Sequence, residues 1–277
     1  MFQHYYEDKN IWNNLNNLIY VSYVVLLTYI VYTQWYNNTD ETLLNYKGNI
    51  PNRYKRILVY SCLIGNYDKV ETFKKQKGYD YILFTDQNIV GTNWTVMPIP
   101  KEVLNLNVSD IKKQRYMKIN PHKFFKNYDL SLYIDANYII KGDLDEFIIN
   151  TLNSIDNIYI THLQFGRNIK RALETAKRNK LDDANLLDKI KERYSHNPEI
   201  LTHYGIVNAG LILRKHHKKD CIKLMERWWE EVEKYSHVDN FAFNYASYKT
   251  GVKFLYVSYQ FTLDYFDHSK HLQKIDY

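Results

Sequence analysis

Apolar runs of strand length alternate with helical patterns after about residue 53, and this alternation limits the fold more than any other feature. Arg56–Ile64 and Tyr79–Thr85 have the apolar character of strands buried on both faces of a parallel sheet. Further strands are expected at Trp94–Ile99, Leu130–Ile140 (broken at Asp135), Ile158–Leu163, Ile206–Leu213 and Val252–Val257. Helices are expected from Ser109 or Asp110 to Pro121, and at Ile169–Lys180, Asn185–Tyr194, Lys218–Tyr235 and Asn240–Tyr248. The sequence therefore predicts one α/β domain with an open, mostly parallel twisted sheet flanked by helices.

Composition excludes some classes of protein. The chain has 277 residues, of which 45% are hydrophobic and 25% charged, as in ordinary globular proteins. A net charge of +6 favours phosphate-bearing ligands or acidic membrane surfaces and does not indicate nucleic-acid binding. The two cysteines, Cys62 and Cys221, have no C-x-x-C spacing, so no disulfide framework or zinc–thiolate site is expected.

An uncharged run near the N-terminus has the length of a membrane span. Its centre, residues 18–36, is close to the roughly 20 apolar residues that cross a bilayer. We expect a transmembrane signal anchor there, after a tail at 1–17 and before a polar stem at 37–52 and a folded domain at 53–277. A buried or surface-lying helix is the alternative, because tyrosines and other polar residues dilute the run. Denser positive charge after the run favours a cytosolic domain, whereas sequons at Asn37, Asn93 and Asn107 fit a lumenal one.

Asp135 follows an apolar strand and begins the triplet Asp135-Ala136-Asn137. Alternate residues of an extended chain share a face, so the carboxylate and the amide oxygen are expected on the same side. Both are ligands for hard divalent cations, which also keep waters and substrate phosphates. The sequence thus predicts a cation beside a diphosphate, and the alternative is a simple turn-forming aspartate.

The expected helix before this strand carries Arg115, Lys118 and His122 at a spacing of three and four. These side chains could share one helix face, although Pro121 ends the helix before His122. Arg115 and Lys118 suit a diphosphate, and a solvated basic face is the alternative.

Five segments together resemble a known family. They lie in consistent order between about Arg56 and Tyr248 and read VYSCLIGNYDKV, YDYILFTD, QRYMKINPHKFFKNYDLSLYIDANYIIKGDLDEF, VNAGLILRKH and MERWWEEVEKYSHVDNFAF. This succession resembles a glycosyltransferase-like family with the GT-A nucleotide-diphospho-sugar fold, long catalogued as a domain of unknown function. The resemblance implies transfer of a sugar from a UDP-sugar to a glycan, protein or lipid acceptor, with Mn²⁺ or Mg²⁺. For a single-pass protein anchored by residues 18–36, the resemblance favours the lumenal face of the Golgi or ER, and the cytosolic face is the alternative.

The resemblance also assigns roles to individual residues. The nucleotide is expected near Gly65, Tyr67, Asp68 and Asp86, the donor phosphates at the R-x-x-K formed by Arg115 and Lys118, and the donor sugar against Asn208 and Gly210. The metal ligands are expected to be Asp135, Asn137 and a late histidine, His271 or His268. The catalytic residues are expected to be Asp135 and Asp239, with Asp239 orienting the acceptor or acting as general base. Asp239 also precedes an apolar helix, so a plain N-cap is the alternative for it.

Other functions remain as alternatives. A glycoside hydrolase needs two carboxylates, for which Asp143, Asp145 and Glu146 are candidates. A lipid amidase is less well supported, since the chain has neither a G-x-S-x-G nor an H-E-x-x-H motif. A sugar- or nucleotide-binding protein without turnover is the alternative outside the enzymes, because Asn137 stands in place of a second carboxylate.

Overall fold

The computed structural model describes residues 56–65, 68–152, 160–202, 205–257 and 259–269, all within one compact unit, Gly48–Tyr277. The predicted tail, membrane anchor and stem lie outside the described residues. None of the helices in the described part of the chain is long and apolar enough to cross a membrane.

A seven-stranded sheet forms the centre of the domain, in the order β3-β2-β1-β4-β7-β6-β8. The strands are β1 (Ile57–Leu63), β2 (Tyr79–Thr85), β3 (Thr95–Pro98), β4 (Leu130–Ile134), β6 (Ile160–Asn168), β7 (Gly205–Arg214) and β8 (Leu255–Val257). Strands β3, β2, β1 and β4 are parallel, β7 runs antiparallel to β4 and β6, and β6 is parallel to β8. The prediction of a mixed α/β fold with a mostly parallel sheet is therefore confirmed.

The predicted break at Asp135 separates two sheets. Strand β4 ends at Ile134, and β5 (Tyr138–Ile140) leaves the main sheet to pair antiparallel with β9 (Phe266–His268). The chain thus turns at Asp135, and the C-terminal strand β9 lies beside the segment that follows it.

The five predicted helices all occur, close to their expected positions. Those described are α2 (Lys101–Leu104), α3 (Asp110–Ile119), α4 (Pro121–Phe124), α5 (Leu144–Leu152), α6 (Ile169–Arg178), α7 (Ala184–Ser195), α8 (Pro198–Thr202), α9 (Lys219–Lys234), α10 (Asn240–Thr250) and α11 (Tyr259–Tyr265). Helix α3 begins where predicted because the side chain of Ser109 accepts a hydrogen bond from the N–H of Lys112, and it ends before Pro121. Helices α2, α4, α5, α8 and α11 were not predicted.

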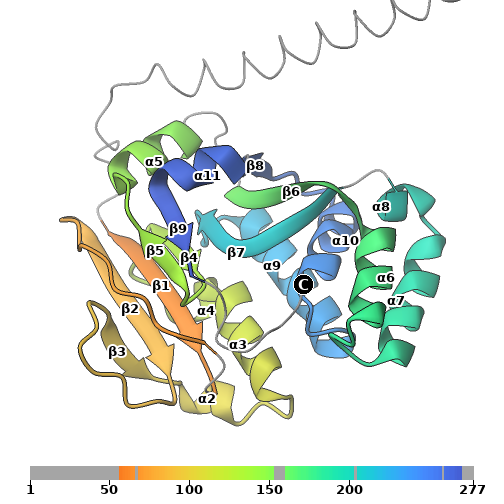
Figure 1. Cartoon of the computed structure of the whole chain (residues 1–277), viewed down its shortest axis with the longest axis horizontal. Coiled ribbons are helices and arrows are strands. Elements are labelled where there is room, and N and C mark those ends of the chain that lie inside the picture. Colours follow the sequence, from red (N-terminus) through yellow and green to blue (C-terminus); the bar gives the residue numbers. More distant parts are fainter. Residues whose placement is uncertain (1–55, 66–67, 153–159, 203–204, 258, 270–277) are drawn as a thin grey trace, which may run out of the picture. The chain divides into compact units, whose positions relative to one another are not determined.

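The sheet is covered on both faces (Figure 1). Side chains of β1 alternate between two cores, with Leu58 and Tyr60 in one and Ile57 and Val59 in the other. The first core is closed by α3, α9 and α10, and the second by α5, α11 and β9. Helices α6, α7 and α8 build a third apolar cluster beside α10. Both faces of β1 and β4 are therefore buried, which leaves the carboxyl ends of these strands as the place for polar groups.

Candidate functional site

The carboxyl ends of β1, β2 and β4 lie at one edge of the sheet because the three strands are parallel. The chain runs outward from β1 to β2 and β3 and then returns to place β4 on the other side of β1. This reversal of strand order is the position where open α/β sheets bind ligands. Gly65, Asp86 and Asp135 follow the ends of β1, β2 and β4 respectively.

Gly65 and Asp86 lie in contact at the ends of β1 and β2. The N–H of Gly65 donates to both carboxylate oxygens of Asp86, each at 3.1 Å, and the side chain of Gln87 donates to the carbonyl of Gly65. Gly65 has a φ of 81°, which favours glycine at this turn. The predicted nucleotide side of the site therefore has a fixed loop at the ends of β1 and β2. Tyr67 lies outside the described residues, and Asp68 is buried, with its carboxylate accepting from the N–H of Lys69.

A chain of hydrogen bonds leads from Asp135 to helix α3. The Tyr133 hydroxyl donates to Asp135 Oδ1 at 2.7 Å, and Gln114 Nε2 donates to the Tyr133 hydroxyl at 2.8 Å. Arg115 Nη1 in turn donates to Gln114 Oε1. Gln114 is itself held by the carbonyl of Cys62 at 3.2 Å. Asp135 is thus coupled to the R-x-x-K segment through two residues that sequence reasoning missed.

The R-x-x-K segment also holds Asp239. Lys118 Nζ lies 2.7 Å and Arg115 Nε 3.6 Å from Asp239 Oδ2. Burial alone would raise the pKa of Asp239, but the nearby charges of Lys118 and Arg115 outweigh it and hold that pKa below its ordinary value. Asp239 occupies the N-cap position of α10, yet its side chain makes no capping hydrogen bond. A role as N-cap therefore does not explain this carboxylate. Asp239 is instead the counter-ion of Lys118 and Arg115 in α3.

Lys118 is less open to a ligand than Arg115. The side chain of Lys118 is 3% exposed and that of Arg115 is 17% exposed. The predicted pair of phosphate ligands is thus divided into a buried lysine and a partly exposed arginine.

The predicted Asn208-x-Gly210 segment lies against Asp135. The N–H of Asp135 donates to the carbonyl of Gly210 at 2.9 Å, and Asn208 Oδ1 accepts from the N–H of Gly210 at 3.1 Å. A Cβ at position 210 would lie 2.9 Å from Asp135 Oδ2 and 3.1 Å from the Tyr138 ring. Glycine at this position therefore leaves room for the Asp135 carboxylate.

The C-terminal strand supplies one of the two predicted late histidines. Pairing of β5 with β9 sets Tyr138 opposite His268, and the two rings lie 5.7 Å apart. Asn137 Nδ2 donates to the carbonyl of Ser269 at 2.9 Å, while Asn137 Oδ1 is buried and has no hydrogen-bond partner. His271 lies outside the described residues.

Few side chains near Asp135 can serve as metal ligands. Among the described residues, no three side chains of His, Cys, Asp or Glu gather closely enough to hold a metal ion. The Asp135 carboxylate and the unpartnered amide oxygen of Asn137 fit a hard cation that takes most of its ligands from waters and phosphates. They do not form a cage made of protein ligands alone.

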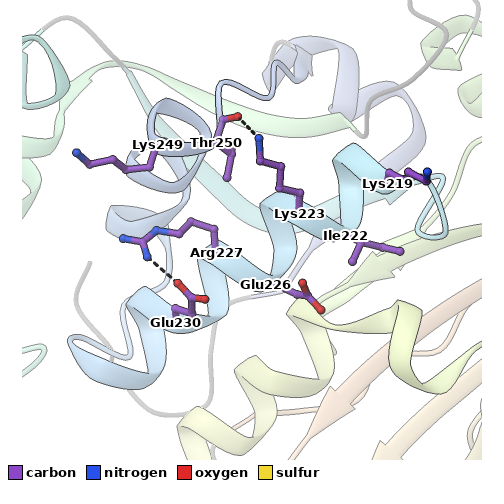
Figure 2. Close-up of a pocket in the computed structure, with 8 residues that line it drawn as sticks. All are labelled: Lys219, Ile222, Lys223, Glu226, Arg227, Glu230, Lys249 and Thr250. Carbon is purple, nitrogen blue, oxygen red and sulfur yellow. Dashed lines mark hydrogen bonds and ion pairs between the residues drawn. The ribbon is translucent and has the colours of Figure 1, made fainter.

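A separate surface cavity of about 620 Å³ lies between α9 and α10 (Figure 2). It is lined by Lys219, Ile222, Lys223, Glu226, Arg227, Glu230, Lys249 and Thr250. Two of its basic side chains are engaged, since Arg227 pairs with Glu230 at 2.6 Å and Lys223 donates to the carbonyl of Thr250 at 2.8 Å. None of the predicted site residues lines this cavity.

Comparison with known proteins gives distant likenesses. No family model matches the chain. The RecBCD enzyme subunit RecB of Buchnera aphidicola subsp. Baizongia pistaciae is 27% identical over 126 residues, which are 45% of this chain and 11% of that protein. The chain therefore spans about a tenth of the length of this curated relative.

Two solved structures have a similar arrangement. The mannosyltransferase Ktr4p from S. cerevisiae has a TM-score of 0.43 and 13% identity over 83% of this chain and 78% of its own. The apo structure of the bifunctional glycosyltransferase WbbM has a TM-score of 0.42 and 14% identity over 76% of this chain and 39% of its own. Both are structures of glycosyltransferases, at TM-scores too low to assign their activity to this chain.

Proposed function

We propose that this chain is a glycosyltransferase that moves a sugar from a nucleotide-diphospho-sugar, preferably a UDP-sugar, to a hydroxyl of a glycan, protein or lipid acceptor. The observation that carries the proposal is the hydrogen-bonded path from Asp135 through Tyr133 and Gln114 to Arg115, at the reversal of strand order. A carboxylate and a guanidinium fixed at one sheet edge suit a ligand that carries both a diphosphate and its cation.

Different residues of the chain bind different parts of the donor. Arg115, the more exposed of the two cations, binds the donor phosphates, and buried Lys118 adds positive charge behind it. The Gly65–Asp86 loop receives the nucleoside, and the backbone at Gly210 lies against the donor sugar. Asp239 holds Lys118 and Arg115 in place.

Asp135 and Asn137 would hold Mn²⁺ or Mg²⁺, with His268 or His271 as a further ligand. When bound, such a cation neutralises the charge that develops on the leaving diphosphate. The unpartnered oxygen of Asn137 supports this assignment because buried polar atoms normally have a partner.

Attachment to a membrane through residues 18–36, with the domain on the lumenal side, is part of the same proposal. Resistance of the full chain to extraction by alkaline carbonate, compared with a chain lacking residues 1–52, tests the attachment. Extraction of the full chain would contradict it.

The hydrolase alternative has weaker support. Asp143, Asp145 and Glu146 are exposed at the start of α5, where Asp143 Oδ1 accepts from the N–H of Glu146 at 3.0 Å. Asp145 accepts from the Tyr79 hydroxyl. Carboxylates in the first turn of a helix cap its free N–H groups and favour its dipole, so a structural role explains them.

A screen of donor hydrolysis across UDP- and GDP-sugars with Mn²⁺ tests the function. We expect release of free sugar from at least one donor, and loss of that release in Asp135→Ala. Asp188→Ala is the matched control, because Asp188 is exposed on α7 and pairs only with Lys177 among the described residues. Nucleotide binding without any release of sugar would favour the binding-protein alternative. Release of sugar from an oligosaccharide without nucleotide would favour the hydrolase.

A further inference from the structure

A carboxylate–imidazole pair joins the loop between α9 and α10 to the connection between α6 and α7. Asp182 Oδ2 lies 3.0 Å from His237 Nδ1 and accepts from the Ser236 hydroxyl at 2.6 Å and from the N–H of His237 at 3.1 Å. Asp182 comes from the connection between α6 and α7, far from the loop in sequence. Three hydrogen-bonding groups of one loop therefore converge on a single carboxylate, which fixes the ring of His237.

The two members of the pair differ in exposure. The side chain of Asp182 is 11% exposed and that of His237 is 25% exposed. Burial alone would raise the pKa of Asp182, but hydrogen bonds from His237, Ser236 and the N–H of Asp183 hold it well below its usual range. Asp182 therefore remains an anion at neutral pH. Because Nδ1 faces this anion, it carries the ring proton of neutral His237, and Nε2 keeps its lone pair.

The pair adjoins the candidate site through Arg115. Arg115 Nε lies 3.4 Å from the carbonyl of His237 and 3.6 Å from Asp239 Oδ2, so one guanidinium contacts both residues. Lys112 Nζ donates to the carbonyls of Glu233 and Tyr235 at 2.7 and 2.8 Å. Helix α3 thus holds both ends of the loop that carries His237.

Charged groups from several elements lie around the loop. Asp182 faces it from the α6–α7 connection, Lys112 and Arg115 face it from α3, and Asp239 begins α10 with Lys118 behind it. Arg193 of α7 and Lys234 at the end of α9 lie over the ring of Tyr235. Asp182 is the only carboxylate among the described residues that forms an ion pair with the ring of His237.

Asp239 is poorly suited to accept a proton. Its carboxylate is 5% exposed and lies against Lys118 and Arg115, and its lowered pKa makes it a weak base. An imidazole oriented by a carboxylate is the usual protein group for taking a proton from a hydroxyl near neutral pH.

We propose that His237, oriented by Asp182, accepts the proton of the attacking acceptor hydroxyl. This role rests on the proposed glycosyltransferase function and suits direct displacement. The acceptor O–H bond breaks and its proton bonds to Nε2, while the oxygen forms a bond to the anomeric carbon. The bond from that carbon to the diphosphate oxygen breaks, and its electron pair leaves with the diphosphate. The imidazolium then returns the proton to water, and Asp182 stays ionised throughout.

Two variants and a control test the pair in the full chain. His237→Gln removes the proton acceptor, and Asp182→Asn removes the charge that selects the tautomer. We expect each to lower the rate of transfer by about 10²-fold or more and to leave the affinity for UDP with Mn²⁺ unchanged. His196→Gln, at the exposed histidine that caps the C-terminus of α7, should change none of these.

The ring tautomer provides a readout independent of activity. Proton–nitrogen correlation spectra of histidine-labelled protein should show the proton of neutral His237 on Nδ1 in the wild-type chain and a redistribution in Asp182→Asn. A proton on Nε2 in the wild-type chain would overturn the proposal whatever the activity. Equal losses of nucleotide affinity and rate would also overturn it, because they indicate a structural role.

The failure of this proposal can be told apart from the failure of the proposed function. An active wild-type chain with an unchanged His237→Gln variant overturns the role of His237 alone. A wild-type chain that neither binds nor cleaves any nucleotide-sugar overturns the glycosyltransferase function and, with it, this role.

Discussion

Two groups of basic side chains meet at the Tyr60 hydroxyl, which donates to the carbonyl of Lys118 and accepts from Arg214, and the groups differ in one respect. At the candidate site, Lys118 and Arg115 face the carboxylate of Asp239. In the second group, fully buried Arg214 donates to the Tyr60 hydroxyl at 2.7 Å, and no carboxylate of the described residues pairs with it. The first group has an anion at its centre, whereas Arg214 in the second group donates only to uncharged partners.

The second group contains histidines that stay uncharged. Burial, together with the charge of Arg214, lowers the pKa of His122 to about 4 and that of His216 to about 3. Both ring nitrogens of His122 and Nδ1 of His216 are buried without a hydrogen-bond partner. A central carboxylate thus accompanies Lys118 and Arg115 in the first group, whereas the second group combines the charge of Arg214 with neutral, acid-sensitive histidines.

The largest expected effect comes from removing the anion of the first group. Asp239→Asn leaves Lys118 buried beside no counter-ion, and we expect the free energy of unfolding to fall by about 3–5 kcal/mol. Urea unfolding measures it. The double variant Asp239→Asn/Lys118→Met should recover part of the loss. A loss below about 1 kcal/mol would contradict the account of this pair.

As the pH falls, the second group should lose stability before the first group does. The pKa values of His122 and His216 in the folded chain lie below the value of 6.5 for a free histidine, so the unfolded chain binds more protons at low pH. The free energy of unfolding should therefore be constant above about pH 6.5 and should fall as the pH drops toward 4. The fall should reach about 2.7 kcal/mol per pH unit when both histidines contribute. Urea midpoints measured from pH 7 to pH 4 test this.

Matched variants separate the histidines from other groups in that experiment. The double variant His122→Gln/His216→Gln should lose less free energy of unfolding between pH 6.5 and 4 than the wild-type chain does. His196→Gln should lose as much as the wild-type chain. Protonation of Asp239 lowers the free energy of unfolding only when the pH falls to the ordinary range of carboxyl pKa values, because the pKa of Asp239 is lowered in the folded chain. Wild-type stability that is constant down to pH 4.5 would contradict neutral burial of the histidines.

A smaller effect is expected from the link between Asp135 and α3. Tyr133→Phe removes a hydroxyl that donates to Asp135 and accepts from Gln114, and we expect a loss of about 1–2 kcal/mol. Tyr128→Phe is the control, since its hydroxyl bonds to exposed Asp80. Equal losses in the two variants would mean that the buried path stabilises the chain no more than a surface contact.

The smallest effect is expected at Glu226. Its carboxylate is 53% exposed and lies 3.7 Å from His122 Nε2, so it is a weak partner of the second group. Glu226→Gln should change the free energy of unfolding by no more than about 0.5 kcal/mol. A loss comparable to that of Asp239→Asn would remove the distinction between the two groups.

Local sequence signals predict much of the fold. The apolar runs locate β1 and β2, Ser109 and Pro121 delimit α3, and the polar residue within an apolar run marks the turn at Asp135. Helix α5 had a usable signal that was overlooked, because Asp143 and Glu146 have the spacing of a capping box.

The contacts that build the site are mostly non-local. Lys118 and Asp239 are separated by most of the domain, and no pattern within either segment indicates that they meet. The pairing of β5 with β9, which places His268 beside Tyr138, likewise depends on the path of the whole chain. Tyr133 could have been found, since it precedes Asp135 by two residues and so shares its side of an extended segment.

Binding of a nucleotide-sugar at Asp135 is the central claim, and isothermal titration of UDP-sugars with Mn²⁺ tests it most directly. The account predicts saturable, cation-dependent binding to the wild-type chain and a loss of at least about tenfold in affinity, or about 1.4 kcal/mol, in Asp135→Ala. Equal affinity in the two chains, or no binding to the wild-type chain by any donor, would contradict it.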